Sequence, residues 1–282
     1  YGVKKFKGSI TCVGKFMNRH SLVHREAHPE QRGAIKDDEV DEFFTQLADA
    51  LVTYEPKYIL NMDQTFINTF NPPKKQIARK GQTTVKVFRD QMKAKEGTTY
   101  LATISLDSSI RLPLYIIARG TTKKCEKKYK TAAENDDKVD HTANGWTTSD
   151  LLVRYLEWIS LKMDSHPIAL LLDTYRAHKH PKVFAAAQRL NIQLIFIPSC
   201  GTGRFQPLDR FVFGVLKNKL RATDLQIDSI DQKQRFSFIH QRVSDIWQEM
   251  NPVIFEKAWD LPGLNDYIYN DSRSDDEEYV EH

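Results

Sequence analysis

The chain has 282 residues, of which 40% are hydrophobic and 28% charged, so it can bury a full hydrophobic core. No apolar run approaches the ~18 residues that a transmembrane helix needs, which argues against a membrane partner. The three cysteines, Cys12, Cys125 and Cys200, are far apart and show no CxxC spacing. This pattern favours a reducing compartment and argues against a structural zinc site.

The net charge is +4, but the charges are distributed unevenly. Residues 1–36 contain eight Lys or Arg against two Glu, and residues 72–96 contain eight against two acidic residues. Residues 265–282 carry seven acidic residues against one Arg, and we expect this tail to be disordered. The two basic blocks indicate a polyanionic partner, nucleic acid before membrane, although charge runs alone are also typical of solvated surfaces.

From the N-terminus, residues 10–20 predict a short amphipathic helix that Ser9 or Thr11 can cap, with Lys15 and Arg19 on its polar face. Such a helix could enter a DNA groove or could simply pack against a neighbour, and these residues alone favour the second interpretation. Residues 28–37 indicate a linker. Asp38 then begins a second amphipathic helix.

The rest of the chain predicts an alternation of short strands and helices. Strands are expected at 58–63, 83–88, 98–105 and 112–118, and residues 120–148 are polar and irregular. The following segments predict a helix from 147–149 to about 163, a strand at 168–173, a short helix, a strand at 192–197, a helix over 207–221 and further helix over 231–260.

The two buried strands at 168–173 and 192–197, with a helix between them, are typical of a βαβ unit in a parallel sheet. The complete order predicts an α/β fold with an RNase H-like mixed sheet and flanking helices. In that fold the first and fourth strands are neighbours. Asp63 ends the first strand and Asp173 ends the fourth, so they would lie side by side although 110 residues separate them.

A third carboxylate, Asp209, falls in the first turn of the next helix and could approach from the side. Taken alone, each of these aspartates is also typical of a turn or a helix cap. Three converging carboxylates repel each other strongly unless cations are bound. Two Mg²⁺ or Mn²⁺ ions would meet this requirement and would support in-line phosphoryl transfer. We therefore predict that Asp63, Asp173 and Asp209 are both the catalytic residues and the metal ligands.

Several motifs resemble the pogo/Tigger branch of the mariner-type DDE/D transposases, which includes the relatives of centromere protein B. The most specific is Gln206-Pro207-Leu208-Asp209, whose aspartate follows Asp173 by 36 residues and which resembles the third-aspartate motif of that branch. Further similar segments are Asn61-Met62-Asp63-Gln64-Thr65, Ala78-Arg79-Lys80-Gly81-Gln82, Gly120-Thr121-Thr122-Lys123, Asn144-Gly145-Trp146, Leu171-Leu172-Asp173 with His178, and Ile197-Pro198.

The resemblance runs from about residue 9 to 260 and implies a cut-and-paste DNA transposase that acts in the nucleus. It implies a homodimer on double-stranded DNA, with terminal inverted repeats and target DNA as partners. Residues 9–22 resemble the last helix of a helix-turn-helix unit, which changes the interpretation of the N-terminal helix to part of a DNA-binding domain. Under this hypothesis the residues that contact DNA are Lys15, Arg19, Lys74, Lys75, Arg79 and Lys80.

The predicted organisation has five parts. They are the C-terminal part of a helix-turn-helix DNA-binding domain (1–28), a linker and connecting helix (29–55), an RNase H-like DDE/D catalytic core (56–225), a C-terminal helical segment (226–264) and the acidic tail (265–282).

Two residues depart from the branch, since Gln64 stands where it usually has Glu and Thr174 where it usually has Asn. With His178, they are predicted to surround the metal ligands. His178 could contact a phosphate or orient Asp173, and it could equally be a histidine at a helix entry. Two other functions stay open: a domesticated, non-catalytic, sequence-specific DNA-binding protein, and a nuclease of the same fold that does not join strands.

Overall fold

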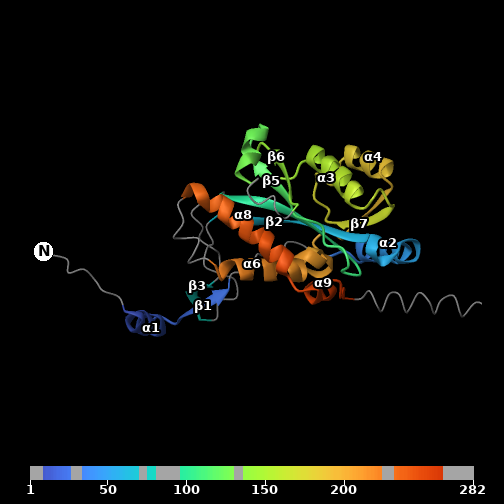
Figure 1. Cartoon of the computed structure of the whole chain (residues 1–282). Coiled ribbons are helices and arrows are strands. Elements are labelled where there is room, and N and C mark those ends of the chain that lie inside the picture. The colour runs from blue at the N-terminus through green and yellow to red at the C-terminus, as the bar shows by residue number, and fades with distance from the viewer. Residues whose placement is uncertain are drawn as a thin grey trace, which may run out of the picture. The chain divides into compact units, whose positions relative to one another are not determined.

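The structure is a computed structural model that describes residues 9–26, 34–69, 75–80, 96–129, 136–223 and 232–262 (Figure 1). The chain divides into two compact units, each built from two separate segments. The first unit comprises Tyr1–Arg32 and Phe70–Glu96, and the second comprises Gly33–Thr69 and Gly97–His282. None of the described helices is long and apolar enough to cross a bilayer.

Among its described residues, the first unit contains one helix and a two-stranded sheet: α1 (Ile10–Arg19), β1 (Leu22–Glu26) and β3 (Lys75–Arg79). Ser9 caps α1, because its side chain accepts a hydrogen bond from the backbone N–H of Cys12. The strands β1 and β3 pair antiparallel and were not predicted from the sequence. The segment 70–96, which the sequence interpretation assigned to the catalytic core, therefore groups with the N-terminal helix, and a helix-turn-helix unit stays a prediction.

The second unit is a six-stranded mixed sheet with helices on both faces. Its elements are α2 (Asp37–Thr53), η1 (Pro56–Tyr58), β2 (Ile59–Asn68), β4 (Gly97–Ser105), β5 (Tyr115–Arg119), η3 (Lys123–Lys128), β6 (Lys138–Thr142), α3 (Ser149–Lys162), β7 (Ile168–Leu172), α4 (Pro181–Arg189), β8 (Ile192–Phe196), α5 (Thr202–Phe205), the π-helical turn η5 (Leu208–Val212), α6 (Phe213–Arg221), α8 (Gln232–Glu249) and α9 (Pro252–Ala258).

The strand order is β6-β5-β4-β2-β7-β8. The meander β2-β4-β5 is antiparallel, whereas β7 runs parallel to β2 and β8 runs parallel to β7. In the RNase H-like arrangement, the first strand lies between the second strand of the meander and a fourth strand that runs parallel to it. The neighbours β4, β2 and β7 have this arrangement, so the predicted fold is confirmed. The edge strand β6 was missed because its sequence is charged and polar, as is common for edge strands.

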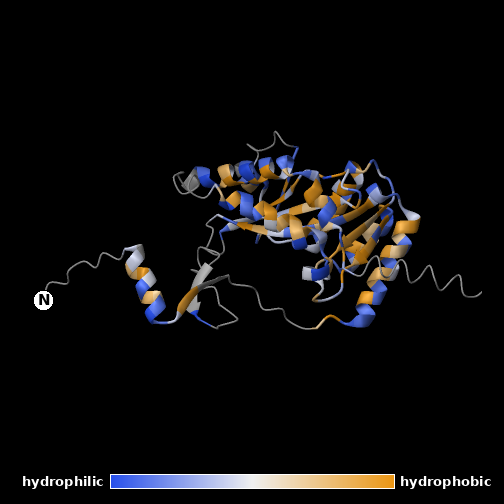
Figure 2. Cartoon of the chain, turned by 90° about the horizontal axis from the view of Figure 1, so that it is seen from below, coloured by the Kyte–Doolittle hydropathy of each residue, from blue (hydrophilic) through white to orange (hydrophobic). Residues whose placement is uncertain are grey.

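The two faces of the sheet carry separate hydrophobic layers, because successive strand residues point to opposite sides. On one face, Ile59 and Leu171 pack with α2, α6, α8 and α9. On the other face, Leu60 and Leu170 pack with α3 and α4, and Figure 1 shows these helices on opposite sides of the strands. Figure 2 shows mostly orange strands and helices that alternate between blue and orange, as expected for helices that bury one face.

Other differences from the sequence predictions are local. The strand predicted at 58–63 extends to Asn68, and α2 begins at Asp37 rather than after an Asp38 cap. The predicted helix over 231–260 divides into α8 and α9 where Asn251 caps the second helix and Pro252 begins it. The strand predicted at 83–88 and the acidic tail at 265–282 lie outside the described residues.

One buried histidine makes the stability of the second unit depend on pH. His240 lies on α8, is fully buried, and places Nδ1 3.3 Å from the hydroxyl of Tyr100. Burial lowers the pKa of His240 to about 4. Between this value and the ordinary pKa of about 6.5, the unfolded chain binds a proton that the folded chain does not, so the free energy of unfolding must fall as pH falls through this window.

We expect His240→Gln to remove part of this acid destabilisation, which amounts to about 3 kcal/mol between pH 7 and pH 4 for a single such histidine. Urea unfolding at several pH values measures the slope directly. Gln248→Ala is the control, because it changes an exposed side chain on the same helix that does not titrate, and it should leave the slope unchanged. An equal pH slope in wild type and His240→Gln would contradict this assignment.

Candidate catalytic carboxylate site

The pairing of β2 with β7 places two of the predicted aspartates side by side. The parallel register runs from Ile59↔Ala169 to Asn61↔Leu171, and Asp63 and Asp173 each stand two residues beyond this last pair. Asp63 and Asp173 stand an even number of residues from Ile59 and Leu171, so their side chains point to the same face as these two residues of the hydrophobic layer under α6 and α8. Asp63 and Asp173 therefore sit at equivalent positions on neighbouring strands, on the face of the sheet that α6 covers.

A buried amide pair brings the third aspartate to the same place. Asn61 and Gln206 are both fully buried, and the Asn61 amide donates to the Gln206 side chain at 2.6 Å and to the Leu171 carbonyl at 3.2 Å. The Asn61 carbonyl oxygen accepts from the backbone N–H of Leu208 at 3.2 Å. These bonds fasten the segment that begins η5 to the start of β2 and to the end of β7, and Asp209 follows in the first turn of η5.

The three carboxylates influence one another electrostatically. Burial first, and then the charges of Asp209 and Asp173, raise the pKa of Asp63 well above its ordinary value. Asp209 is exposed on one side, yet removal from water on its protein side raises its pKa; Lys217 opposes this shift and Asp173 adds to it. The structure thus brings together the three aspartates that the sequence predicted.

Asp63 lies within β2 rather than at its end, because this strand continues to Asn68, whereas Asp173 directly follows β7. Both aspartates are also held by local partners. Asp63 is 5% exposed, and its Oδ1 accepts from the backbone N–H of Gln64 at 2.7 Å, while its Oδ2 is buried and has no hydrogen-bond partner. Asp173 lies with Oδ1 2.6 Å from Nδ1 of His178. His178 is 2% exposed, and its Nε2 is also without a partner. A buried, unpaired carboxylate oxygen beside two further carboxylates is a donor set that suits a hard divalent cation.

One charged residue beside the aspartates was not predicted from the sequence. Lys217 lies half-buried on α6, and burial lowers the pKa of its ammonium, while the charges of Asp209 and Asp63 act in the opposite direction. It follows Asp209 by eight residues, about two helical turns, so it returns to the same side of the helix. This eight-residue spacing is the feature of the sequence from which the position of Lys217 could have been predicted. The π-helical turn between them is a feature frequently found at functional sites.

The residues predicted to surround the metal ligands have different positions. His178 contacts Asp173 directly. Gln64 contacts Asp63 through its backbone, but its side chain accepts a hydrogen bond from the hydroxyl of Thr147 at 2.5 Å. Thr174 is half-buried and lines a small cavity of about 210 Å³ beneath α2. The two departures from the resembled family, Gln64 and Thr174, therefore point their side chains toward other neighbours.

The predicted DNA-binding residues belong to the first unit. Lys15 and Arg19 are exposed on α1, and Arg79 and Lys80 are exposed at the end of β3. For Lys75 the structure describes the backbone, within β3. Lys74 lies outside the described residues.

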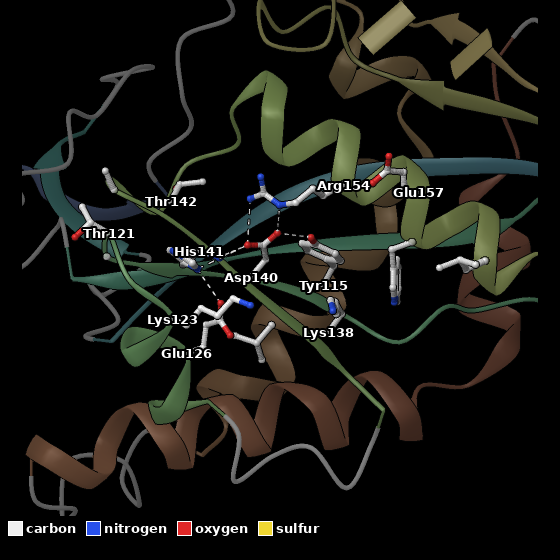
Figure 3. A pocket seen from close by; sticks show the side chains of 15 residues that line it. Tyr115, Thr121, Lys123, Glu126, Lys138, Asp140, His141, Thr142, Arg154 and Glu157 are labelled. Carbon is white, nitrogen blue, oxygen red and sulfur yellow. Dashed lines mark hydrogen bonds and ion pairs between the residues drawn. The ribbon is translucent and has the colours of Figure 1, made fainter. Parts of the chain in front are cut away.

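A second cluster of possible metal ligands lies three strands from β2. Glu126, Asp140 and His141 place one ligand atom each within 4.8 Å of the others, the one such group among the described residues. It borders a cavity of about 750 Å³ between η3, β6 and α3 (Figure 3). Arg154 donates to both oxygens of Asp140, and Tyr115 donates to one of them. We therefore interpret this network as an ion pair that joins β6 to α3.

A mixed RNase H-like sheet with one aspartate within its first strand, a second directly after its fourth strand and a third on a following helical turn defines a class of nucleic-acid-processing domains. Within that class the chain belongs to the DDE superfamily endonuclease family, whose sequence pattern matches residues 95–259. The match includes Asp173 and Asp209, whereas Asp63 lies upstream of it.

The relatives found by sequence agree with this assignment. The chain is 25% identical to the Tigger transposable element-derived protein 4 of Mus musculus over 273 residues, which cover 93% of the chain and 50% of that protein. It is also 25% identical to the mouse protein named Pogo transposable element with KRAB domain, over 78% of the chain and 36% of that protein. The chain thus spans half or less of the length of these relatives. The resemblance to the pogo/Tigger branch is confirmed.

Solved structures with a similar chain path were also found. The Mos1 mariner paired end complex with Mn is 12% identical, with a TM-score of 0.43 and coverage of 86% of this chain and 69% of that chain. The paired end complex with Mg is 12% identical, with a TM-score of 0.42 and coverage of 85% and 68%.

We expect Asn61→Ala to destabilise the second unit by about 2–4 kcal/mol, because it leaves the Gln206 side chain, the Leu171 carbonyl and the Leu208 N–H with unmet hydrogen bonds. Urea unfolding at pH 7 measures this change. Gln248→Ala, which alters an exposed amide at the end of α8, serves as control and should stay within about 0.5 kcal/mol. A similarly small effect of Asn61→Ala would show that the amide pair does not fasten η5.

Proposed function

We propose that this chain contains the catalytic core of a cut-and-paste DNA transposase, with Asp63, Asp173 and Asp209 as its catalytic carboxylates. The observation that carries the proposal is the buried Asp63, which has an unpaired Oδ2 and whose pKa is raised by both other aspartates. Such a concentration of acids is unfavourable for folding and is typical of a functional site. The family match over residues 95–259 supports the same reaction class.

The three aspartates would hold two divalent ions, Mg²⁺ or Mn²⁺. Bound there, the ions would supply a nucleophile at neutral pH and stabilise charge on the attacking and leaving oxygens of a phosphodiester. Asp63 offers a buried oxygen without a partner, and Asp209 is open to solvent on one side. This combination suits an ion that keeps water and substrate phosphate among its ligands.

The other residues of the site would position and balance charge. His178 orients Asp173 through its contact with Oδ1, and the pair Asn61–Gln206 fixes the backbone from which Asp209 projects. Lys217 adds a positive charge beside Asp63 and Asp209. It would attract a DNA phosphate into a site that is otherwise acidic.

The partners that follow are double-stranded DNA, as terminal inverted repeats and as target, bound by a homodimer in the nucleus. Exposed cations in the first unit, Lys15, Arg19, Arg79 and Lys80, would contact phosphates. Lys74 and Lys75 would extend this set.

A non-catalytic DNA-binding protein is the second candidate function. The name of one relative describes it as derived from a transposable element, and such a protein can keep a fold after losing its reaction. Salt-sensitive DNA binding without metal-dependent cleavage would support this candidate. A nuclease of the same fold would cleave DNA but fail to join strands.

We expect the purified chain to nick DNA that carries the inverted repeats of its source element when Mn²⁺ or Mg²⁺ is added. Asp173→Asn should reduce this activity at least about 100-fold, because one carboxylate ligand is lost. Asp164→Asn is the matched control, since Asp164 is exposed in the turn before β7. Equal cleavage by wild type and Asp173→Asn would overturn the catalytic assignment.

A thermal-shift experiment tests metal binding without requiring activity. In EDTA, Asp63→Asn should raise Tm, because it removes a buried charge that burial and two neighbouring carboxylates disfavour. With Mn²⁺ at 100 times its dissociation constant, wild type should gain about 2.7 kcal/mol, and Asp63→Asn should lose this gain. Asp150→Asn, at an exposed ion pair with Lys182, should retain it. An Mn²⁺ shift that survives Asp63→Asn would place the ion elsewhere.

A further inference from the structure

The turn between β6 and α3 presents an exposed tryptophan on a firmly held backbone. Trp146 is 54% exposed, yet its own carbonyl accepts a hydrogen bond from the Thr142 hydroxyl at 2.9 Å. The preceding Gly145 carbonyl accepts from the Thr99 hydroxyl at 2.8 Å. Gly145 has φ of 72°, a conformation that glycine adopts without strain. The indole is thus held out toward solvent by a turn that is anchored to β4.

A second aromatic ring covers one face of this indole. Phe66, on β2, stacks on Trp146 with ring centroids 5.6 Å apart and planes 15° from parallel. Space for Phe66 depends on Gly97, where an added Cβ would lie 2.5 Å from the Phe66 ring and 2.3 Å from the Ile67 carbonyl. The pair is therefore built into the sheet and leaves part of the indole open, as a platform on which another flat ring can stack.

The platform is connected to the candidate catalytic strand. Phe66 follows Asp63 by three residues on β2, about 10 Å along the strand. The neighbouring Thr147 donates to the side chain of Gln64, the residue next to Asp63. Because successive strand residues point to opposite faces, Phe66 lies on the face of the sheet that α3 covers, whereas Asp63 lies on the face that α6 covers.

The surroundings of the platform carry positive charge. Arg119, at the exposed end of β5, packs against Gly145, whose added Cβ would lie 3.2 Å from the Arg119 Cβ. Lys123 and Lys124 follow in η3 and are exposed. The nearby acid Asp140 is paired with Arg154. Cations beside an aromatic platform are the combination that binds single-stranded nucleic acid, with phosphates on the cations and bases on the rings.

We propose that Trp146, backed by Phe66, stacks on an unpaired base of a single strand of DNA. The identity of the strand as a transposase substrate rests on the proposed function, whereas the stacking itself does not. An unpaired base at a DNA end has its π-face free, so stacking on Trp146 would favour frayed or single-stranded ends over a continuous duplex.

The test compares two probes with the full chain in EDTA, where metal-dependent cleavage does not occur. One probe is a fluorescein-labelled 20-base-pair duplex with a four-thymidine overhang, and the other is the same duplex with blunt ends. Fluorescence anisotropy should show tighter binding of the overhang probe. Trp146→Ala should weaken overhang binding by about 5- to 100-fold, the range expected for one lost base stack, and should leave blunt binding unchanged.

Two further variants make the comparison specific. Trp146→Phe keeps an aromatic ring and should retain most of the overhang preference, whereas Trp146→Leu keeps an apolar side chain and should lose it. Phe184→Ala is the matched control, because Phe184 is a similarly exposed aromatic residue, 45% exposed, that contacts another phenylalanine, Phe196. It should leave both affinities unchanged.

Tryptophan fluorescence gives an independent measurement. Trp247 and Trp259 are buried and Trp158 is partly buried, so acrylamide quenching in the wild type should report mainly Trp146. A twelve-residue oligothymidine should protect wild type from quenching and should have no such effect on Trp146→Phe. Overhang affinity and protection that are independent of Trp146 would overturn the proposal, as would Trp146-dependent self-association in place of DNA binding.

The outcomes separate this proposal from the proposed function. Loss of the overhang preference in Trp146→Ala, with no cleavage by wild type in Mn²⁺, would support stacking and reject the transposase. Cleavage that requires Asp173, with an overhang preference that ignores Trp146, would reject stacking alone.

Discussion

The position of the acidic site depends on hydrogen bonds between two buried neutral side chains, Asn61 and Gln206. A polar group that is excluded from water must find its partners inside the protein. Asn61 finds them in Leu171, Gln206 and Leu208, which belong to segments far apart in the sequence. Satisfying one amide therefore fixes β2, β7 and η5 together. The aspartates are carried to one place by this framework, against their own mutual repulsion.

The fold therefore places more negative than positive charge at this site. Asp63 is buried beside two other acids, and the cation that acts on it, Lys217, is itself partly withdrawn from water. The cost of keeping these charges close is met by packing elsewhere in the unit, since the hydrophobic layers on both faces of the sheet are extensive. A site maintained at such a cost is expected to act on ions of the opposite sign.

The sequence revealed the fold wherever burial is periodic. The strands β2, β4, β7 and β8 are continuous or alternating apolar runs, and their order determined the neighbours of Asp63. It could not reveal β6, which is short and charged, or the pairing of β1 with β3, whose partners are about fifty residues apart. Lys217 was missed because a lysine on a helix is normally solvent-exposed, and only the folded helix shows which acids it approaches.

The first unit is assembled from two pieces of chain, with β1 before the large sheet begins and β3 between its strands β2 and β4 in the sequence. The polypeptide therefore passes between the two units three times, so three chain connections join the units rather than one. A shortened protein that begins at α2 would keep every strand of the large sheet but would leave β3 without its hydrogen-bonding neighbour. Such an unpaired strand edge is a template for pairing with another chain, so this shortened protein would be prone to self-association.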